Sequence, residues 1–166
     1  MVRGWQHVVV ADFENVYEGL RRQILEVDPA EVGLRPSPEL PDVWGAMMET
    51  GHDRGTSTLV ALADGTTSLY LSSGGGIVGG GRHARVAAAT RDLLAVVQRR
   101  WPDFAEAGDT ALPATDRVVL RGLAYAGHRA VDADEDDLGY GRHPFSEIFL
   151  AGHAVITELR LIEEAR

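Results

Sequence analysis

The sequence predicts an α+β domain: a single antiparallel sheet of about five strands packed with two or three helices, in the order α-βββ-α-ββ-α. Two observations support this prediction. Apolar residues recur at helical spacing near the start, the middle and the end of the chain. Between these segments, runs rich in β-branched and aromatic residues flank the dipeptides Asp64-Gly65 and Ala126-Gly127, as strands flank the turns of hairpins.

The N-terminal part, residues 1–27, is expected to hold the first helix over 12–27, with Asp12 as its N-cap. The preceding run 8–10 is all valine, and it is either a short strand or the start of this helix. Four prolines between residues 28 and 42 disfavour a helix, so we expect a linker there. Its length leaves open whether the first helix packs on its own domain or on a neighbouring copy.

Residues 43–166 are expected to form the α+β domain itself, in one globular unit with the N-terminal part. A strand over 43–49 leads through a turn at 51–55 into a hairpin, whose strands cover 56–63 and 66–72. The three strands together make an antiparallel meander.

The turn of this hairpin, Asp64-Gly65, suits a two-residue type I′ turn because both of its positions need positive φ. A two-residue turn also sets the register of the strands. It would place Val60 opposite Leu69 and Leu59 opposite Tyr70.

The second half of the domain is expected to begin with a helix over 82–101, which a proline ends. A second hairpin follows, with strands over 118–125 and 128–131. An acidic loop then leads to a last helix over 144–165, and the proline at its start suits the first helical position.

The last helix is apolar on two sides. One stripe is Ile148, Gly152, Val155, Leu159 and Ile162. The second stripe, on the opposite side, is Leu150, Ala154, Thr157 and Leu161. Such a helix is either buried deeply within one chain or shared between the core and a partner, and both alternatives stay open.

The composition excludes several classes of site. The chain has 166 residues, 45% of them hydrophobic, which is enough for a core without disulfides or metal. It has no cysteine and no lysine, which excludes thiolate metal sites, cysteine nucleophiles, lysine Schiff bases and Walker A loops. The net charge of −9 opposes nucleic-acid binding. Because no apolar run suits a signal peptide or a membrane helix, we expect a cytoplasmic protein without membrane or nucleic-acid partners.

The glycine-rich stretch 74–81 holds six glycines in eight residues and joins an expected strand to an expected helix. It matches the G-x-G-x-x-G pattern of dinucleotide sites, but no parallel strand with an acidic end follows the helix. Two alternatives remain, a structural turn or an anion site made of backbone amides, the helix dipole and basic side chains. The candidate anion-binding residues are Gly75, Gly76, Gly79, Gly80, Gly81, Arg82, His83 and Arg85.

Other chemistry finds little support in the sequence. The acidic stretch 132–137 has the first three ligand positions of a calcium loop, but lacks its glycine and its closing glutamate. The histidines show no metal-binding spacing, and no serine lies in a nucleophile elbow. We therefore assign no catalytic residues, no metal ligands and no cofactor.

The hairpin over 59–71 around Asp64-Gly65, followed by a helix from Arg82, resembles the roadblock and longin-like family of small α/β modules. In that family a five-stranded antiparallel sheet lies between helices. The resemblance extends from residue 43 onward. It implies a non-catalytic dimeric scaffold or regulator that binds other proteins, often small GTPases.

The sequence thus predicts a non-enzymatic interaction or regulatory module, as a homodimer or with a protein partner. Its contact surface is expected at an edge of the sheet or at the second stripe of the last helix. The alternative is a binding protein or enzyme that holds an anionic small molecule, a phosphate or a nucleotide, at the turn 74–81.

Overall fold

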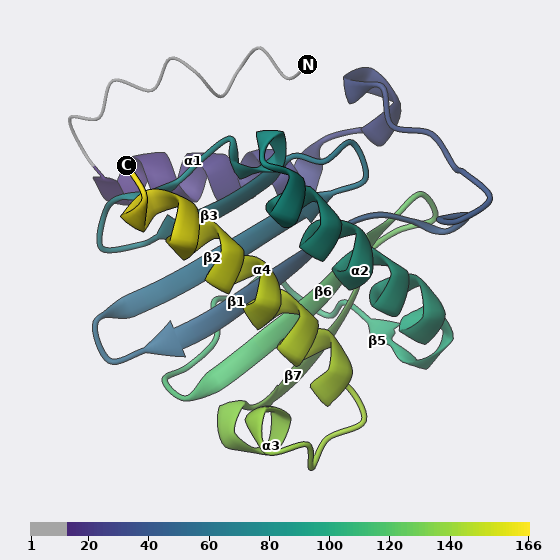
Figure 1. The fold of residues 1–166 in the computed structure, drawn as a ribbon. Helices are drawn as coiled ribbons and strands as arrows, with labels where there is room; N and C mark the ends of the chain where they lie inside the picture. The colour runs from purple at the N-terminus through teal and green to yellow at the C-terminus, as the bar shows by residue number, and fades with distance from the viewer. Residues whose placement is uncertain (1–12) are drawn as a thin grey trace.

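The computed structural model describes residues 13–166, with side chains from residue 16 onward. Its centre is one antiparallel sheet of seven strands in the order β4-β3-β2-β1-β6-β7-β5 (Figure 1). The strands are β1 (Val43–His52), β2 (Gly55–Leu62), β3 (Thr67–Leu71), β4 (Gly76–Ile77), β5 (Ala105–Glu106), β6 (Arg117–Ala124) and β7 (Arg129–Asp134).

The five long strands confirm the predicted α+β fold, with three strands before the middle helix and two after it. The remaining strands, β4 and β5, have two residues each and lie at opposite edges of the sheet. They are too short to form a recognisable sequence pattern. Short edge strands offer few free backbone groups to another chain, so both edges are protected against further pairing.

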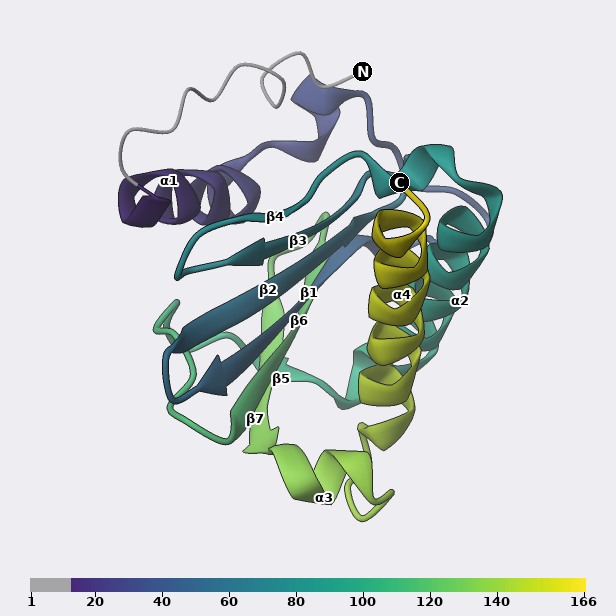
Figure 2. The same cartoon turned by 60° about the vertical axis from the view of Figure 1, so that its left-hand side comes forward.

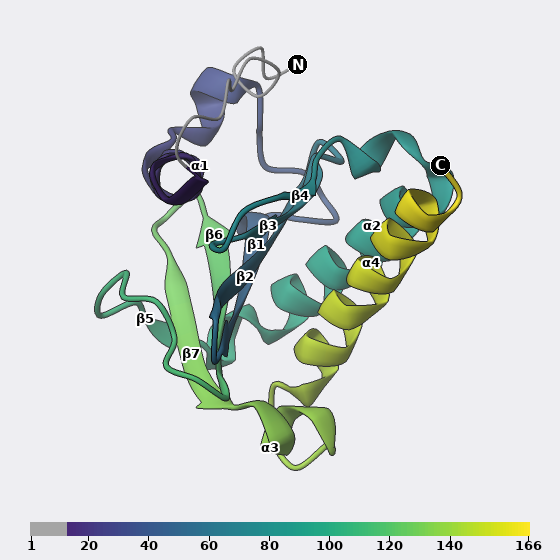
Figure 3. The same cartoon turned by 90° about the vertical axis from the view of Figure 1, so that its left-hand side faces the viewer.

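Helices cover both faces of the sheet and give the fold three layers (Figures 2 and 3). α2 (Ala84–Arg100) and α4 (Ser146–Glu164) lie side by side on one face, and α1 (Phe13–Glu26) lies on the other. Because successive side chains of a strand point to opposite faces, the central strand supplies both sides. Met48 packs in the cluster under α2 and α4, and Met47 packs in the cluster under α1.

The layer between the sheet and α4 is tightly packed. Ile148, Val155 and Leu159 of the first predicted stripe are buried there. Gly152 lies so close to β1 that a Cβ atom would stand 2.7 Å from the sulfur of Met48. The first stripe of the last helix is therefore its core-facing side, which both sequence alternatives required.

α1 packs on the sheet of its own domain. Its side chains Tyr17 and Ile24 are buried in one cluster with Trp44 and Leu123. The linker passes from α1 to β1 through a short 3₁₀ helix over Pro29–Val32. Of the two alternatives that the linker left open, the structure has the first.

The register of the first hairpin differs from the prediction by one residue. The pairs of Val60 with Leu69 and of Leu59 with Tyr70 are wrong, since Leu59 lies opposite Leu69. The loop spans three residues, 63–65, and its final glycine has a φ of 94°. A three-residue loop that ends in a left-handed residue is a common hairpin connection, and it shifts the pairing by one.

Two further boundaries differ from the prediction. β1 continues to His52, because Thr50 and Gly51 still pair with β2, and the turn is shorter than the predicted 51–55. The acidic stretch is not one loop: it ends β7 and then forms α3 (Glu135–Gly139). The side chain of Asp134 accepts a hydrogen bond from the backbone N–H of Asp137 and so caps this helix. This bond gives Asp134 a structural role.

Two predictions, the run 8–10 and the N-cap Asp12, lie outside the described residues. Within the described part of the chain, no helix is long and apolar enough to cross a lipid bilayer.

The packing of α1 predicts a large cost for truncating its central apolar side chain. Ile24 is 2% exposed, so Ile24→Ala leaves a cavity and should lower the free energy of unfolding by about 3 kcal/mol. Gln23→Ala, at an exposed position of the same helix, should change it by less than about 0.5 kcal/mol. Urea unfolding followed by circular dichroism measures both, and equal midpoints would contradict the packing of α1 on its own sheet.

Candidate functional site

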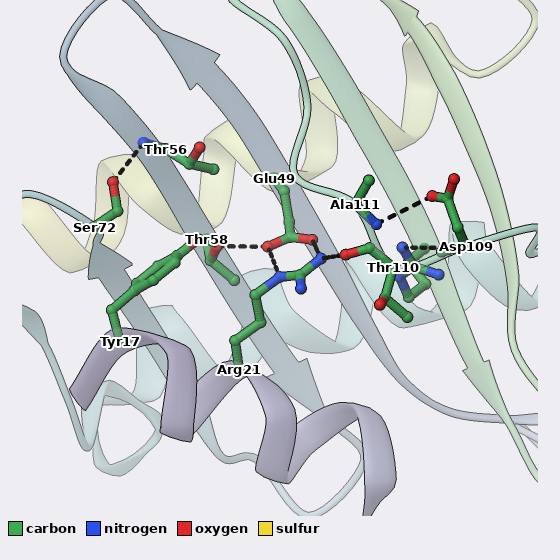
Figure 4. Close-up of polar contacts among 10 residues, drawn as sticks. Tyr17, Arg21, Glu49, Thr56, Thr58, Ser72, Asp109, Thr110 and Ala111 are labelled. Carbon is green, nitrogen blue, oxygen red and sulfur yellow. Dashed lines mark hydrogen bonds and ion pairs between the residues drawn. The ribbon is translucent and has the colours of Figure 1, made fainter. Parts of the chain in front are cut away.

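A group of buried polar side chains lies between α1 and the sheet (Figure 4). At its centre is Glu49 of β1, whose side chain is fully buried. Arg21 of α1 binds this carboxylate twice, through Nε to Oε2 at 2.8 Å and through Nη2 to Oε1 at 2.9 Å. A bidentate pair of this kind allows one relative orientation, so it fixes the position of α1 on the sheet.

Thr58 and Tyr17 complete the surroundings of the carboxylate. Thr58 Oγ1 donates to Glu49 Oε2 at 2.8 Å, and Tyr17 Oη lies 2.6 Å from Thr58 Oγ1. Because the one hydroxyl proton of Thr58 points to Glu49, Tyr17 donates to Thr58. Burial raises the pKa of Tyr17, and the nearby charge of Glu49 adds to this rise, which keeps the phenol protonated as a donor.

The segment 107–116, called the strap below, joins β5 to β6 and lies beside this group (Figure 4). Nη2 of Arg21 donates to the carbonyl oxygen of Thr110. Nη2 of Arg121, a buried arginine of β6, donates to the carbonyl oxygen of Asp109 at 3.4 Å. Two arginines on different elements thus hold adjacent carbonyls of the strap.

His128 lies near the same face of the sheet, directly before β7. Its Nε2 lies 3.2 Å from the carbonyl oxygen of Leu25, so Nε2 carries the proton, and its ring packs edge-on against Trp44 at 5.8 Å. Burial lowers the pKa of His128, and the positive charge of Arg121 lowers it further. The imidazole is therefore neutral at pH 7 and links β7 to the end of α1.

The chemistry of this group is that of a structural ion pair. Both oxygens of Glu49 accept hydrogen bonds from Arg21, and one accepts a third from Thr58. A carboxylate engaged in this way and fully buried is a poor general base, because it cannot reach a substrate proton. The group therefore positions α1 and the strap, and it supplies no catalytic acid or base.

The glycine-rich turn lies elsewhere, between β3 and α2, where its glycines permit close packing. A Cβ atom on Gly76 would stand 2.3 Å from the carbonyl oxygen of Leu69, and one on Gly81 would stand 1.8 Å from that of Gly65. A Cβ on Gly80 would stand 2.2 Å from a methyl of Leu159 in α4. These three positions have a steric reason to be glycine that involves no ligand.

The remaining candidates of this turn have open surroundings. Gly75 and Gly79 have positive φ, and a Cβ atom at either would meet nothing within 4 Å. Arg82, His83 and Arg85 are exposed at the start of α2. His83 is the N-cap, its side chain makes no capping bond, and the first turn holds no acidic residue. The basic side chains thus surround an uncapped helix N-terminus, and their role in anion binding stays a prediction.

A cavity of about 740 Å³ lies next to this turn, between the linker, α2 and the β2–β3 loop. Gly81 is part of its wall, and its charged lining residues are Glu39, Asp64, Asp92 and Arg91. With more acidic than basic side chains, the cavity opposes an anion. Any anion held at the turn would therefore sit at the exposed N-terminus of α2 and not in this cavity.

The second stripe of the last helix is exposed over its whole length. Leu150 is 52% exposed and Leu161 is 46% exposed, and Ala154 and Thr157 between them are exposed as well. α4 packs on the sheet through its buried side, so this stripe on the opposite side of the helix faces away from the sheet. A strip with a leucine at each end and small residues between them is a candidate contact surface.

Among residues 13–166, no three or more histidine, aspartate and glutamate side chains are placed to hold a metal ion. No protein-family model matches the chain, no curated protein matches its sequence, and no solved structure matches its fold.

The sequence reasoning missed the buried polar group, although a signal for it exists. Glu49 and Arg121 each interrupt an apolar run of a strand, after Met48 and after Leu120. A charged residue inside a buried strand needs a partner, because burial of an unpaired charge is costly. The sequence gives no indication which residue is that partner, since Arg21 lies 28 residues before Glu49.

The steric role of the turn predicts a difference between two exchanges of glycine for alanine. Gly81→Ala should lower the free energy of unfolding by about 2 kcal/mol or more, because the new Cβ meets a backbone carbonyl. Gly108→Ala, with nothing within 4 Å of the new atom, should change it by less than about 0.5 kcal/mol. Thermal unfolding measures both, and a harmless Gly81→Ala would contradict the packing of the turn.

Proposed function

We propose that this protein is a non-enzymatic interaction module that forms a homodimer through the exposed stripe of α4. The observation that carries the proposal is the exposure of Leu150, Ala154, Thr157 and Leu161 on a helix whose opposite side is buried. The resemblance to roadblock and longin-like modules stays a prediction. It implies helices on both faces of a sheet, as in this structure, and it also implies the dimer that we propose.

The stripe is suited to pair with itself. Its spacings are four, three and four residues, and its order of size is large, small, small, large from either end. In a twofold dimer with antiparallel helices, Leu150 of one copy would lie against Leu161 of the other. Ala154 and Thr157 would meet at the centre, where small side chains let two helices approach closely.

The other predicted contact surface, the sheet edge, is less suited to a dimer. β4 and β5 cover the two edges and have only two residues each. Continuous pairing between two sheets needs a longer free edge. The α4 stripe is therefore the better candidate of the two surfaces.

The dimer can be tested by size-exclusion chromatography with light scattering. The wild-type chain should have twice the monomer mass at micromolar concentration. The double variant Leu150→Glu, Leu161→Glu should raise the dissociation constant at least about 100-fold, since it places like charges in an apolar contact. Leu112→Glu, at an exposed leucine of the strap, is the matched control and should stay dimeric. A monomeric wild type would refute the proposal.

A second candidate function is the binding of an anionic small molecule at the start of α2. It is favoured by the uncapped helix N-terminus, where free backbone donors and the helix dipole attract negative charge. Arg82 and Arg85 are exposed there and take part in none of the ion pairs found among residues 13–166. A phosphate or a nucleotide is the class of ligand that this arrangement fits.

A thermal-shift experiment with nucleotides and phosphorylated metabolites tests this second candidate. A ligand at 100 times its dissociation constant should stabilise the protein by roughly 2.7 kcal/mol. The double variant Arg82→Ala, Arg85→Ala should lose this stabilisation, and Arg91→Ala, at an exposed position later in the same helix, should keep it. The candidate fails when no anion raises the melting temperature, or when the double variant responds as the wild type does.

A further inference from the structure

Arg121 is the most unusual buried group in the described part of the chain. It lies on β6, is 3% exposed, and its Nε has no hydrogen-bond partner. Its one side-chain hydrogen bond within residues 16–166, from Nη2 to the carbonyl oxygen of Asp109, is long at 3.4 Å. A buried guanidinium normally has its donors paired with carboxylates or several carbonyls, because an unpaired buried donor is costly. Arg121 therefore has binding capacity that the described protein groups do not use.

No carboxylate among the described residues forms an ion pair with this side chain. Arg121 and Arg21 bind adjacent carbonyl oxygens, and the charges of Glu49 and Asp109 act on Arg121 without binding it directly. Both oxygens of Glu49 are already bound to Arg21. The carboxylate of Asp109 is exposed and accepts a bond from the backbone of Ala111 (Figure 4). Arg121 is thus a buried cation without a carboxylate partner of its own.

Backbone carbonyl oxygens of the strap take the place that a carboxylate would have beside Arg121. The carbonyl oxygens of Asp109 and Thr110 accept bonds from Arg121 and Arg21. A carbonyl oxygen carries only a partial charge, so a carboxylate in the same place would bind a guanidinium more strongly. The strap has no regular structure, and all its residues except Ala107 and Pro113 are exposed. Both ends of the strap are bound to neighbouring chain, through the amides of Ala107 and Asp116. Only its exposed middle, which carries the carbonyls of Asp109 and Thr110, has to shift.

We propose that Arg121, with Arg21 beside it, binds a small organic acid through its carboxylate, which replaces the carbonyl oxygens of Asp109 and Thr110. The planar guanidinium offers two parallel donors, Nε and one Nη, which match the two oxygens of a carboxylate. A carboxylate carries a single negative charge, whereas a doubly charged phosphate would bring more negative charge into a buried place near Glu49. The site lies on the α1 face of the sheet and is independent of the α4 stripe.

The test uses the absence of cysteine in this chain. The L112C variant carries its only thiol on the strap, at an exposed position, and an environment-sensitive fluorophore there reports movement of the strap. Propionate and benzoate are the probes, with chloride at equal ionic strength as the reference and inorganic phosphate as the competing anion. We expect saturable fluorescence changes with the carboxylates alone.

Two arginine variants in the L112C background identify the residue responsible. Arg121→Met should weaken the carboxylate response at least about tenfold. Arg117→Met is the matched control, because Arg117 lies on the same strand but is half exposed and paired with Asp132 at 2.9 Å. It should respond as the parent does. An unchanged response in Arg121→Met overturns the proposal, and so does a response to phosphate alone or a response to no anion.

A measurement on the unmodified chain keeps the proposal testable even where Arg121→Met does not fold. The Nε–H proton of Arg121 gives its own signal in a ¹H–¹⁵N spectrum, and a bound carboxylate would move it downfield as the hydrogen bond forms. Titration with propionate should shift this signal saturably, with the same midpoint as the fluorescence. A signal that stays in place at saturating carboxylate overturns the site.

Discussion

The bidentate pair between Arg21 and Glu49 is the interaction on which the arrangement of the α1 face depends. Burying a carboxylate costs several kcal/mol unless its oxygens are fully bound, and here α1, β1 and β2 together supply the donors. The carboxylate thus requires α1 to be in place, and α1 in turn closes the apolar cluster around Trp44. Apolar packing gives this layer its stability, and the ion pair gives α1 its orientation.

The two faces of the sheet pack against their helices in different ways. Under α2 and α4 the contact is apolar and close, with glycine at the points where backbone meets backbone or side chain, as at Gly81 and Gly152. Under α1 the contact mixes apolar and charged groups, and Arg121 remains incompletely paired. A fully satisfied buried network stabilises one geometry, whereas a buried donor without a partner costs free energy. The carboxylate binding proposed for Arg121 would recover part of this cost on the α1 face.

Local signals were enough to predict the fold, and long-range pairing was not predictable from them. The dipeptide Asp64-Gly65 and the helical periodicities identified five strands and three helices in the correct order. The hairpin register was wrong because one dipeptide fits both a two-residue and a three-residue loop. Glycines of the turn 74–81 suggested a ligand site, but close contacts with Gly65, Leu69 and Leu159 explain three of them. The Arg21–Glu49 pair was missed for the same reason, since periodicity carries no information about tertiary partners.

The two proposed surfaces, the α4 stripe and the arginine site, lie on opposite sides of the sheet. A dimer through α4 would leave the strap and α1 exposed on the outside of the assembly, because α1 covers the other face (Figure 3). In the described part of the chain the sheet lies between them, with Met48 packed against α4 and its neighbour Met47 in the cluster under α1. A bound acid that displaces the strap acts on exposed, irregular chain and leaves these buried contacts intact. Occupancy of the arginine site should therefore leave the dimer unchanged, and the two surfaces would act independently: one sets the assembly, and the other presents a ligand-dependent strap to a partner.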